Sequence, residues 1–591
     1  MRCAEAANSA STPIATTDGG ASHDERWGVR LALLAAAPLL FAIVLMGFVG
    51  RYGFSPADEG LVEDYAVHML AGQIPHVDFI SPRPIGSSLL HLPTLLAGGP
   101  WILEERFIAA VEFAVTSLAL AFVALRERPA RLGPVLVAVA MAAAAVNLHT
   151  FPLMAWYTVD GLLLVAVGYA LVLQGLNASS RWRVLVGLFL AGVAATTKQS
   201  FLPAILIALA LAICARARWT RAGARDLAAA ALAAVAAPAA YVLTVAAAGG
   251  ARALLTQSTN SSTGFLLAPV RSLLQTPMAP VVAVGGLLIV GAMVLQRRPP
   301  QGLRRLRALA TIAATVGVVG LPLLLPRVLW YGSTYGWAWF WLCAVAGATA
   351  WILDRRPDPG LLLVLSVGWM AALSWGAPYP DLVAGSLALV TLIRLWEAAP
   401  VPSFDPRAVR AAAAACAVAV LAIIIMVRLV TVYRDHPAPE LTADLTPVSP
   451  ALAGVLTNPV TAEYLEQIQT CVAKYRASRV ALLPDGAGAY AALGLRPAMP
   501  IDWMWPPDYK GSAPMIANGA ARLGRQGDVL VLWQTFDTGR LATMTSLPVA
   551  TLSSRPFERD RGLGDRLRAA FGPFNDTCGS FLVRYLPAGS R

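Results

Sequence analysis

The sequence predicts an α-helical membrane protein that crosses the bilayer many times and carries a smaller α/β domain at its C-terminal end. Of the 591 residues, 57% are hydrophobic and only 14% are charged, and the mean hydropathy is +0.62. A soluble domain usually has about a quarter of its residues charged. Apolar runs long enough to span the hydrocarbon core recur through residues 30–432. Residues 433–591 contain no such run.

The apolar runs divide the chain into three parts. Residues 1–29 are rich in Ala, Ser, Thr and Gly, which predicts a disordered cytoplasmic tail. Residues 30–432 predict a transmembrane domain of about thirteen helices, with a long first extracytoplasmic loop over residues 51–106. The expected spans are 31–50, 107–125, 132–148, 158–175, 184–197, 201–215, 227–247, 277–296, 308–326, 338–353, 360–375, 381–396 and 411–432.

Arginine-rich gaps between the apolar runs predict the orientation. The chain has 46 basic and 34 acidic residues, a net charge of +12. The excess gathers in short gaps such as "RERPAR" and "RARWTRAGAR", which all fall on one side of the membrane if the spans alternate. This is the positive-inside pattern, so it indicates a lipid bilayer and no nucleic-acid partner. We expect a plasma (inner) membrane protein with a cytoplasmic N-terminus and, since the span number is odd, an extracytoplasmic C-terminal domain.

The C-terminal residues 433–591 predict this α/β domain. Short strand-like stretches at 479–486, 527–536 and 580–587 alternate with a helix-like one at 461–477. Cys471 and Cys578 are its two cysteines, and in an oxidising compartment they could form a disulfide. Two free thiols are the alternative.

The first loop is rich in ionisable residues for a chain that is only 14% charged. Asp58 and Glu59 directly follow the first span, although a carboxylate before a helix is often only a cap. The next segment, 60–73, has helical spacing and predicts a helix lying along the membrane surface. Asp78 and Arg83 then occupy a proline-flanked turn. Carboxylates beside an arginine suit a site where a nucleophile is deprotonated close to an anionic phosphate.

These motifs resemble the GT-C glycosyltransferases, and most closely the protein O-mannosyltransferase and lipid A aminoarabinose-transferase branch. That branch carries an acidic pair just after the first span, which Asp58-Glu59 matches. A short helix and a glycine turn follow, as in "LAGQIP", and then a basic residue before proline. "Arg83-Pro84-Ile85" fills this last position with arginine instead of lysine or histidine, and with isoleucine instead of a second proline.

The resemblance implies a membrane enzyme that takes a sugar from a polyprenyl-phosphate donor. Asp58 would be the base that activates the acceptor, with Glu59 and Asp78 as supporting carboxylates. Arg83 would bind the lipid phosphate. Some members of the family use a divalent cation and others do not, so Mg²⁺ or Mn²⁺ is an open question here.

Two further positions are candidates for phosphate binding. Lys198 and Gln199 together form the first of these positions, at a predicted outer end, and Lys198 is the only lysine in the span region. Similar Lys-Gln pairs occur in this enzyme class, although a lysine that snorkels to the interface is the alternative. Arg327 stands at the predicted outer end of another span.

Aromatic residues in the outer loops are candidates for lining the substrate cavity. His149, Trp156 and Tyr157 lie in one such loop and Tyr331 in another. Tryptophan and tyrosine also form belts at membrane interfaces without any catalytic role, which is the alternative interpretation.

The sequence therefore favours an inverting glycosyltransferase that acts on an extracytoplasmic glycan, lipid or protein. Two other classes stay open: a transporter or flippase for an anionic lipid or solute, and a polysaccharide ligase or polymerase. A transporter usually carries ionisable groups near the middle of the bilayer, whereas here they gather at one face. Ligases of this kind usually place their key residues in a late loop.

Overall fold

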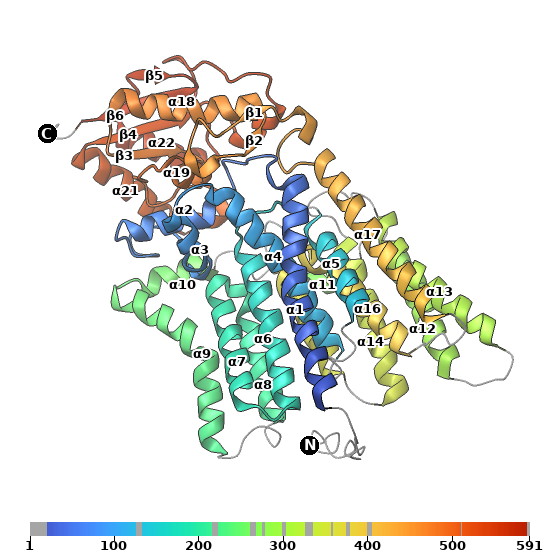
Figure 1. Cartoon of the computed structure of the whole chain (residues 1–591). Helices are drawn as coiled ribbons and strands as arrows, with labels where there is room; N and C mark the ends of the chain where they lie inside the picture. Colours follow the sequence, from blue (N-terminus) through green and yellow to red (C-terminus); the bar gives the residue numbers. More distant parts are fainter. Residues whose placement is uncertain are drawn as a thin grey trace.

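The computed structural model describes residues 20–125, 133–149, 151–215, 223–259, 267–274, 278–297, 303–325, 335–355, 358–373, 379–398, 405–509 and 511–587. These residues form a helical bundle whose one end is covered by residues 433–587, the C-terminal unit (Figure 1). Helix α1 (Gly20–Leu45) starts at the opposite end, so the predicted tail is helical from Gly20 onward.

Each of the thirteen predicted spans coincides with a helix of the structure. Eight helices in the described part of the chain are long and apolar enough to cross a membrane, and the other five have 13 to 17 residues. The helices are α1, extended by a π-helical turn (Met46–Gly50), α4 (Trp101–Ala124), α5 (Pro134–Leu148), α6 (Tyr157–Asn177), α7 (Arg181–Thr197), α8 (Leu202–Cys214), α9 (Ala224–Ala247), α12 (Met278–Arg297), α13 (Arg304–Gly320), α14 (Tyr335–Asp354), α15 (Pro359–Ala371), α16 (Ala384–Ala398) and α17 (Pro406–Val430). Two short helices, α10 (Ala251–Thr259) and α11 (Ala268–Leu273), connect α9 to α12.

The helices differ in how much of their surface other helices cover. In α4 and α6, 72% and 67% of the most apolar window is buried, whereas the value is 17% in both α9 and α17. Leu232 and Leu243 of α9 and Val418 of α17 are each about two-thirds exposed. Helices α9 and α17 thus expose many apolar side chains, as expected for helices that contact lipid tails. We conclude that the chain is a helical membrane protein.

Helices α6 and α7 pack unusually closely. A Cβ added to Gly187 would lie 2.5 Å from the carbonyl oxygen of Gly168 on the facing helix. Small residues at such a contact let two backbones approach, which is a common way to join helices in a bilayer. The end of α7 is joined to the start of α6 by the Thr197 hydroxyl, which donates to the carbonyl oxygen of Tyr157 over 3.1 Å, and several candidate site residues lie there.

The C-terminal unit contains a four-stranded sheet in the order β3-β4-β6-β5. Strands β3 and β4 are parallel and the other pairs antiparallel. The predicted strand and helix stretches are confirmed. The strands are β3 (Arg479–Leu483), β4 (Val529–Gln534), β5 (Asp576–Cys578) and β6 (Phe581–Leu586), beside a small pair, β1 (Ala443–Asp444) and β2 (Leu456–Thr457). The helices are α18 (Pro459–Tyr475), α19 (Ala487–Leu493), α20 (Pro506–Tyr509), α21 (Ala513–Gln526) and α22 (Arg561–Phe571).

Strand β4 shows why this sheet needs helices on both faces. Every residue of β4 is buried, and successive side chains point to opposite faces. Leu530 and Leu532 join the hydrophobic core that includes α18, while Val531 and Trp533 join the core that includes α21 and α22. A strand that is apolar at every position is typical of a sheet covered on both sides.

The disulfide predicted as one of two alternatives is present. Cys471 of α18 and Cys578 of β5 are bonded, with their Cα atoms 5.9 Å apart. The bond ties α18 to the edge strand of the sheet.

Candidate functional site

The first loop lies between the helical bundle and the C-terminal unit (Figure 1). It runs over residues 51–100 and contains helices α2 (Leu61–Leu70) and α3 (Gly86–Ala97). The predicted loop reached residue 106, but α4 already begins at Trp101. Glu105 and Arg106 therefore belong to a helix of the bundle.

The C-terminal unit covers α2 at close range. The Gly488 backbone N–H donates to the carbonyl oxygen of Pro56 over 3.0 Å, and a Cβ on Gly488 would lie only 2.1 Å from the carbonyl oxygen of Glu59. Glu63 and Asp64 of α2 are 1% and 0% exposed. The predicted helix is therefore present, and its polar side is covered by protein; its position along the membrane surface stays a prediction.

Asp58, the predicted base, is buried and held by two residues of the C-terminal unit. The Tyr433 hydroxyl donates to its Oδ2 over 2.8 Å, and the Arg434 guanidinium lies 2.7 Å from the same oxygen. Burial raises the pKa of Asp58 above its usual value of 3.8, although Arg434 and Tyr433 oppose the rise. The N-cap of α2 is Gly60, without a side-chain capping bond, so Asp58 does not cap this helix.

Glu59 points to a different partner. Its two carboxylate oxygens accept from Nε and one terminal nitrogen of Arg106 over 2.7 and 2.8 Å. Arg106 also donates to backbone carbonyls at Gly50 and Gly53. This bidentate pair fastens the start of the loop to α4. Glu59 and Arg106 also line a hollow of about 460 Å³, open mouth included, together with Tyr433.

Asp78 lies apart from these residues on an exposed turn. Its Oδ2 accepts from the backbone N–H of Ile74 over 2.7 Å. The three carboxylates predicted to act together thus have separate partners.

Arg83 and Lys198, both predicted to bind phosphate, are brought together and buried. The Arg83 guanidinium lies over the rings of Tyr157 and Trp156, at 5.0 and 5.9 Å from their centres, and 3.7 Å from Asp508. Lys198 donates to the hydroxyl of Thr158 over 3.0 Å. We refer to Arg83 and Lys198 as the cation pair.

The charge of Lys198 is weakly compensated. It is 6% exposed, and among the described residues no carboxylate lies within 4.0 Å of its ammonium group. Burial, with a smaller contribution from Arg83, lowers the pKa of Lys198 to about 7. A buried cation in this state favours binding of an anion. The neighbouring Gln199 donates to the carbonyl oxygens of Pro82 and Ser258, which joins α7 to the turn that carries Arg83.

The predicted lining residues divide into two groups. Trp156 and Tyr157 begin α6 beside the cation pair, and Tyr157 is fully buried. His149 instead follows α5 and contacts Tyr335, whose hydroxyl lies 3.1 Å from Nδ1. Arg327 and Tyr331 lie outside the described residues.

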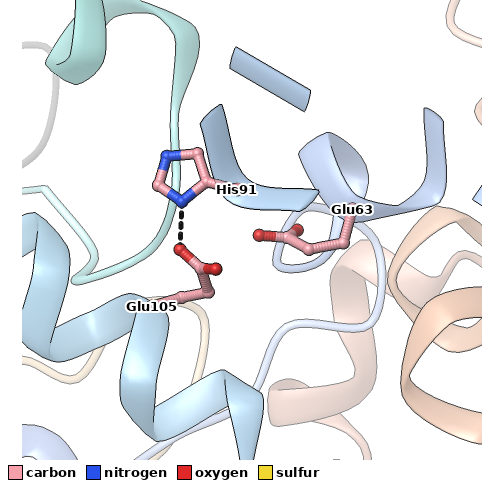
Figure 2. A group of neighbouring side chains, drawn as sticks. All are labelled: Glu63, His91 and Glu105. Carbon is pink, nitrogen blue, oxygen red and sulfur yellow. Dashed lines mark ion pairs between the residues drawn. The ribbon is translucent and has the colours of Figure 1, made fainter. Parts of the chain in front are cut away.

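A buried acidic cluster next to these residues was not predicted. His91 of α3 is paired with Glu105 through Nδ1 and with Asp160 through Nε2, and Glu63 and Glu112 lie close by. Figure 2 shows Glu63 and Glu105 pointing toward one another beside the imidazole. Burial, reinforced by Glu105, raises the pKa of Glu63 to about 8. Burial disfavours charged His91, but Asp160 and Glu105 outweigh it and raise its pKa to about 12.

A second unpredicted group joins α2 to the C-terminal unit. His68 bonds Gln73 and Asp502 through its two ring nitrogens, and Asp64 lies beside them. Burial raises the pKa of Asp64 well above 3.8, and Asp502 raises it further.

One sequence signal could have led to the first of these groups. Glu112 lies inside the apolar run 107–125, and a carboxylate within a span usually faces another ionisable group. The partners of Glu112 are His91 of α3 and Asp160 of α6. A carboxylate in an apolar run therefore indicates that a buried polar group exists, but it does not identify the other residues of that group.

Neither a scan against protein-family models nor a search of curated proteins found a match to this chain.

Proposed function

We propose that the protein is a membrane glycosyltransferase that uses a polyprenyl-phosphate sugar as donor and a glycan, lipid or protein as acceptor. The observation that carries this proposal is the buried cation pair. Arg83 stacks on two aromatic rings, and Lys198 has no carboxylate within 4.0 Å among the described residues. Cations buried beside aromatic rings suit a phosphate ester attached to a sugar.

In the proposed reaction, Asp58 removes the proton from the acceptor hydroxyl or amine. The acceptor then attacks the anomeric carbon, and the bond from that carbon to the phosphate oxygen breaks. The sugar is transferred with inversion, and polyprenyl phosphate leaves with the bonding electron pair, stabilised by Arg83 and Lys198. Glu59 holds the loop on α4, and Asp78 shapes the exposed turn. No step here requires a metal.

We further infer that all thirteen helices cross the plasma (inner) membrane, with the first loop and the C-terminal unit outside. Two observations support this topology. The arginine-rich gaps all fall on one side if the spans alternate. Helix α1 begins at the end of the bundle away from the C-terminal unit, as an odd number of spans requires.

A transporter of anionic lipids is the second candidate, because Glu112 and Asp160 are carboxylates buried inside α4 and α6. Intramembrane carboxylates often mark a transport path. The test below separates the two functions.

The test uses purified protein in lipid nanodiscs with a panel of labelled polyprenyl-phosphate sugars. Wild type is compared with Asp58→Asn and with Asp565→Asn, an exposed position on α22. We expect wild type and Asp565→Asn to consume one donor. Asp58→Asn should bind that donor but transfer its sugar about 100-fold more slowly or worse. Equal rates in all three proteins would exclude Asp58 as the base. Donor flipping in vesicles without sugar transfer would support the transporter instead.

A further inference from the structure

The acidic cluster brings one imidazole and two carboxylates from three separate helices to one point. Glu63 comes from α2, His91 from α3 and Glu105 from α4. One potential ligand atom from each lies within 4.8 Å of the others, and all three side chains are buried. Figure 2 shows the three side chains converging from different elements.

Among the described residues, Glu63 has no hydrogen-bond partner for either carboxylate oxygen, although it is 99% buried. A carboxylate that is desolvated in this way is costly unless a proton or a cation compensates it. Its side chain extends toward Glu105 and His91 (Figure 2). Glu63 is thus aimed at the centre of the group, where its carboxylate oxygens accept no hydrogen bond from the part of the chain that the structure describes.

His91 is oriented as a metal-binding histidine usually is. Its Nε2 lies 3.1 Å from Oδ1 of Asp160, while its Nδ1 faces Glu105. A metal-binding imidazole commonly donates its other N–H to a carboxylate, which fixes the ring and raises its basicity. Glu105 is supported in turn by the Thr94 hydroxyl, which donates to Oε1.

The excess of carboxylates in the acidic cluster also favours a bound cation. Glu63, Glu105, Glu112 and Asp160 surround the single His91, and among the described residues no lysine or arginine forms an ion pair with any of them. A protonated His91 balances only one of the four carboxylates. A divalent cation at Nδ1 would replace that ring proton and balance two of them, with a neutral imidazole as its ligand.

We propose that Glu63, His91 and Glu105 bind one divalent transition-metal ion, Mn²⁺ or Zn²⁺, with Asp160 as the residue that positions the histidine. One nitrogen and two carboxylate oxygens form a ligand set that both ions accept. The ion would join the first loop to α4. This site is independent of the sugar-transfer proposal and uses none of its residues.

The test is metal binding by the full-length protein in nanodiscs, first dialysed against a chelator. Mn²⁺ is followed by electron paramagnetic resonance and Zn²⁺ by elemental analysis after gel filtration. The variants are Glu63→Gln, Asp160→Asn, Asp502→Asn in the neighbouring group, and Glu466→Gln, an exposed position on α18. We expect one ion per chain in wild type, Asp502→Asn and Glu466→Gln. Binding should be lost in Glu63→Gln and weakened roughly 10- to 100-fold in Asp160→Asn.

Thermal unfolding gives a second measurement that does not depend on activity. The metal should raise the Tm of wild type and leave that of Glu63→Gln unchanged. In chelator, Glu63→Gln should unfold at the same temperature as wild type or higher, because it lacks the uncompensated carboxylate. The proposal is overturned if folded wild type binds no ion, if Glu63→Gln binds as tightly as wild type, or if Asp502→Asn loses the ion while Glu63→Gln keeps it.

Discussion

The cation pair and the acidic cluster lie on either side of the start of α6 and have opposite charge. Thr158 accepts a hydrogen bond from Lys198, while Asp160, two residues later, contacts His91. Two residues correspond to a rotation of about 200° around a helix, so these side chains leave α6 on nearly opposite faces. One turn of α6 thus separates a buried excess of positive charge from a buried excess of negative charge.

The comparison shows that the sign of the uncompensated charge, rather than burial alone, indicates the kind of ligand. Both groups are almost completely buried. Among the described residues, Lys198 has no carboxylate within 4.0 Å and favours an anion, whereas Glu63 forms no ion pair with a lysine or arginine and favours a metal ion. Four predictions test whether the two groups act separately, and they are ordered from the largest expected effect to the smallest.

Reversal of charge at Lys198 should have the largest effect on donor binding. Lys198→Glu places a carboxylate beside Arg83 and repels the donor phosphate. We expect the Kd for the polyprenyl-phosphate sugar to rise about 100-fold or more, since disrupting a buried charged contact costs roughly 3–5 kcal/mol. Equilibrium binding of labelled donor in nanodiscs measures this. Lys474→Gln, at an exposed lysine of α18, is the control, and an unchanged Kd in Lys198→Glu would remove Lys198 from the site.

Donor binding should weaken as the pH rises. The lowered pKa of about 7 means that Lys198 is charged below this pH and loses its charge above it. The phosphodiester of the donor stays anionic over this range, so we expect the Kd to rise roughly tenfold between about pH 6.5 and about pH 8.5. Lys198→Gln should bind weakly at every pH and show a flat profile. A wild-type profile as flat as that of the variant would contradict the assignment.

Loss of the Thr158 hydroxyl should have a smaller effect on the same binding. Thr158→Val keeps the shape of the side chain but removes the acceptor that holds the Lys198 ammonium group. A hydrogen bond to a charged group contributes roughly 1.5–3 kcal/mol, and the Lys198 ammonium group can recover part of this by turning toward the donor phosphate, so the Kd should rise about threefold to tenfold. Isothermal titration calorimetry at about pH 6.5, below the pKa of Lys198, measures this Kd. A larger loss than in Lys198→Glu would indicate that Thr158 itself contacts the donor.

Neutralisation of the acidic cluster should leave donor binding nearly unchanged. Glu63→Gln removes a charge on the other side of α6, so we expect the donor Kd to stay within about twofold of wild type. The same binding assay in chelator measures it. A tenfold change would show that the two groups are coupled, and the comparison between them would then fail.

Much of the bundle could be predicted because apolar runs and arginine-rich gaps are local signals. All thirteen predicted segments contain helices, and the strands of the C-terminal unit follow their apolar stretches. The end of the first loop was misplaced because Glu104, Glu105 and Arg106 interrupt the hydropathy of a helix that begins at Trp101. Hydropathy alone does not distinguish a charged helical turn from a loop.

The candidate site could be predicted in part. Arg83 and Lys198 were identified separately from a motif and from an unusual lysine, and the structure places them together. The partners of Asp58 could not be predicted, because Tyr433 and Arg434 lie far along the chain and follow no recognisable motif. Glu63 and His91 were visible as ionisable residues, but their convergence with Glu105 depends on how α2, α3 and α4 pack.

The bond between Tyr433 and Asp58 also has a consequence for how the protein is made. These residues are 375 positions apart, so the loop enters the growing protein long before its partners are synthesised. Until then, Asp58 lacks both the hydroxyl and the guanidinium that hold it. A ribosome that stops after α17 leaves the helical bundle with an unfinished site, and translation of Tyr433 and Arg434 supplies the missing partners of Asp58.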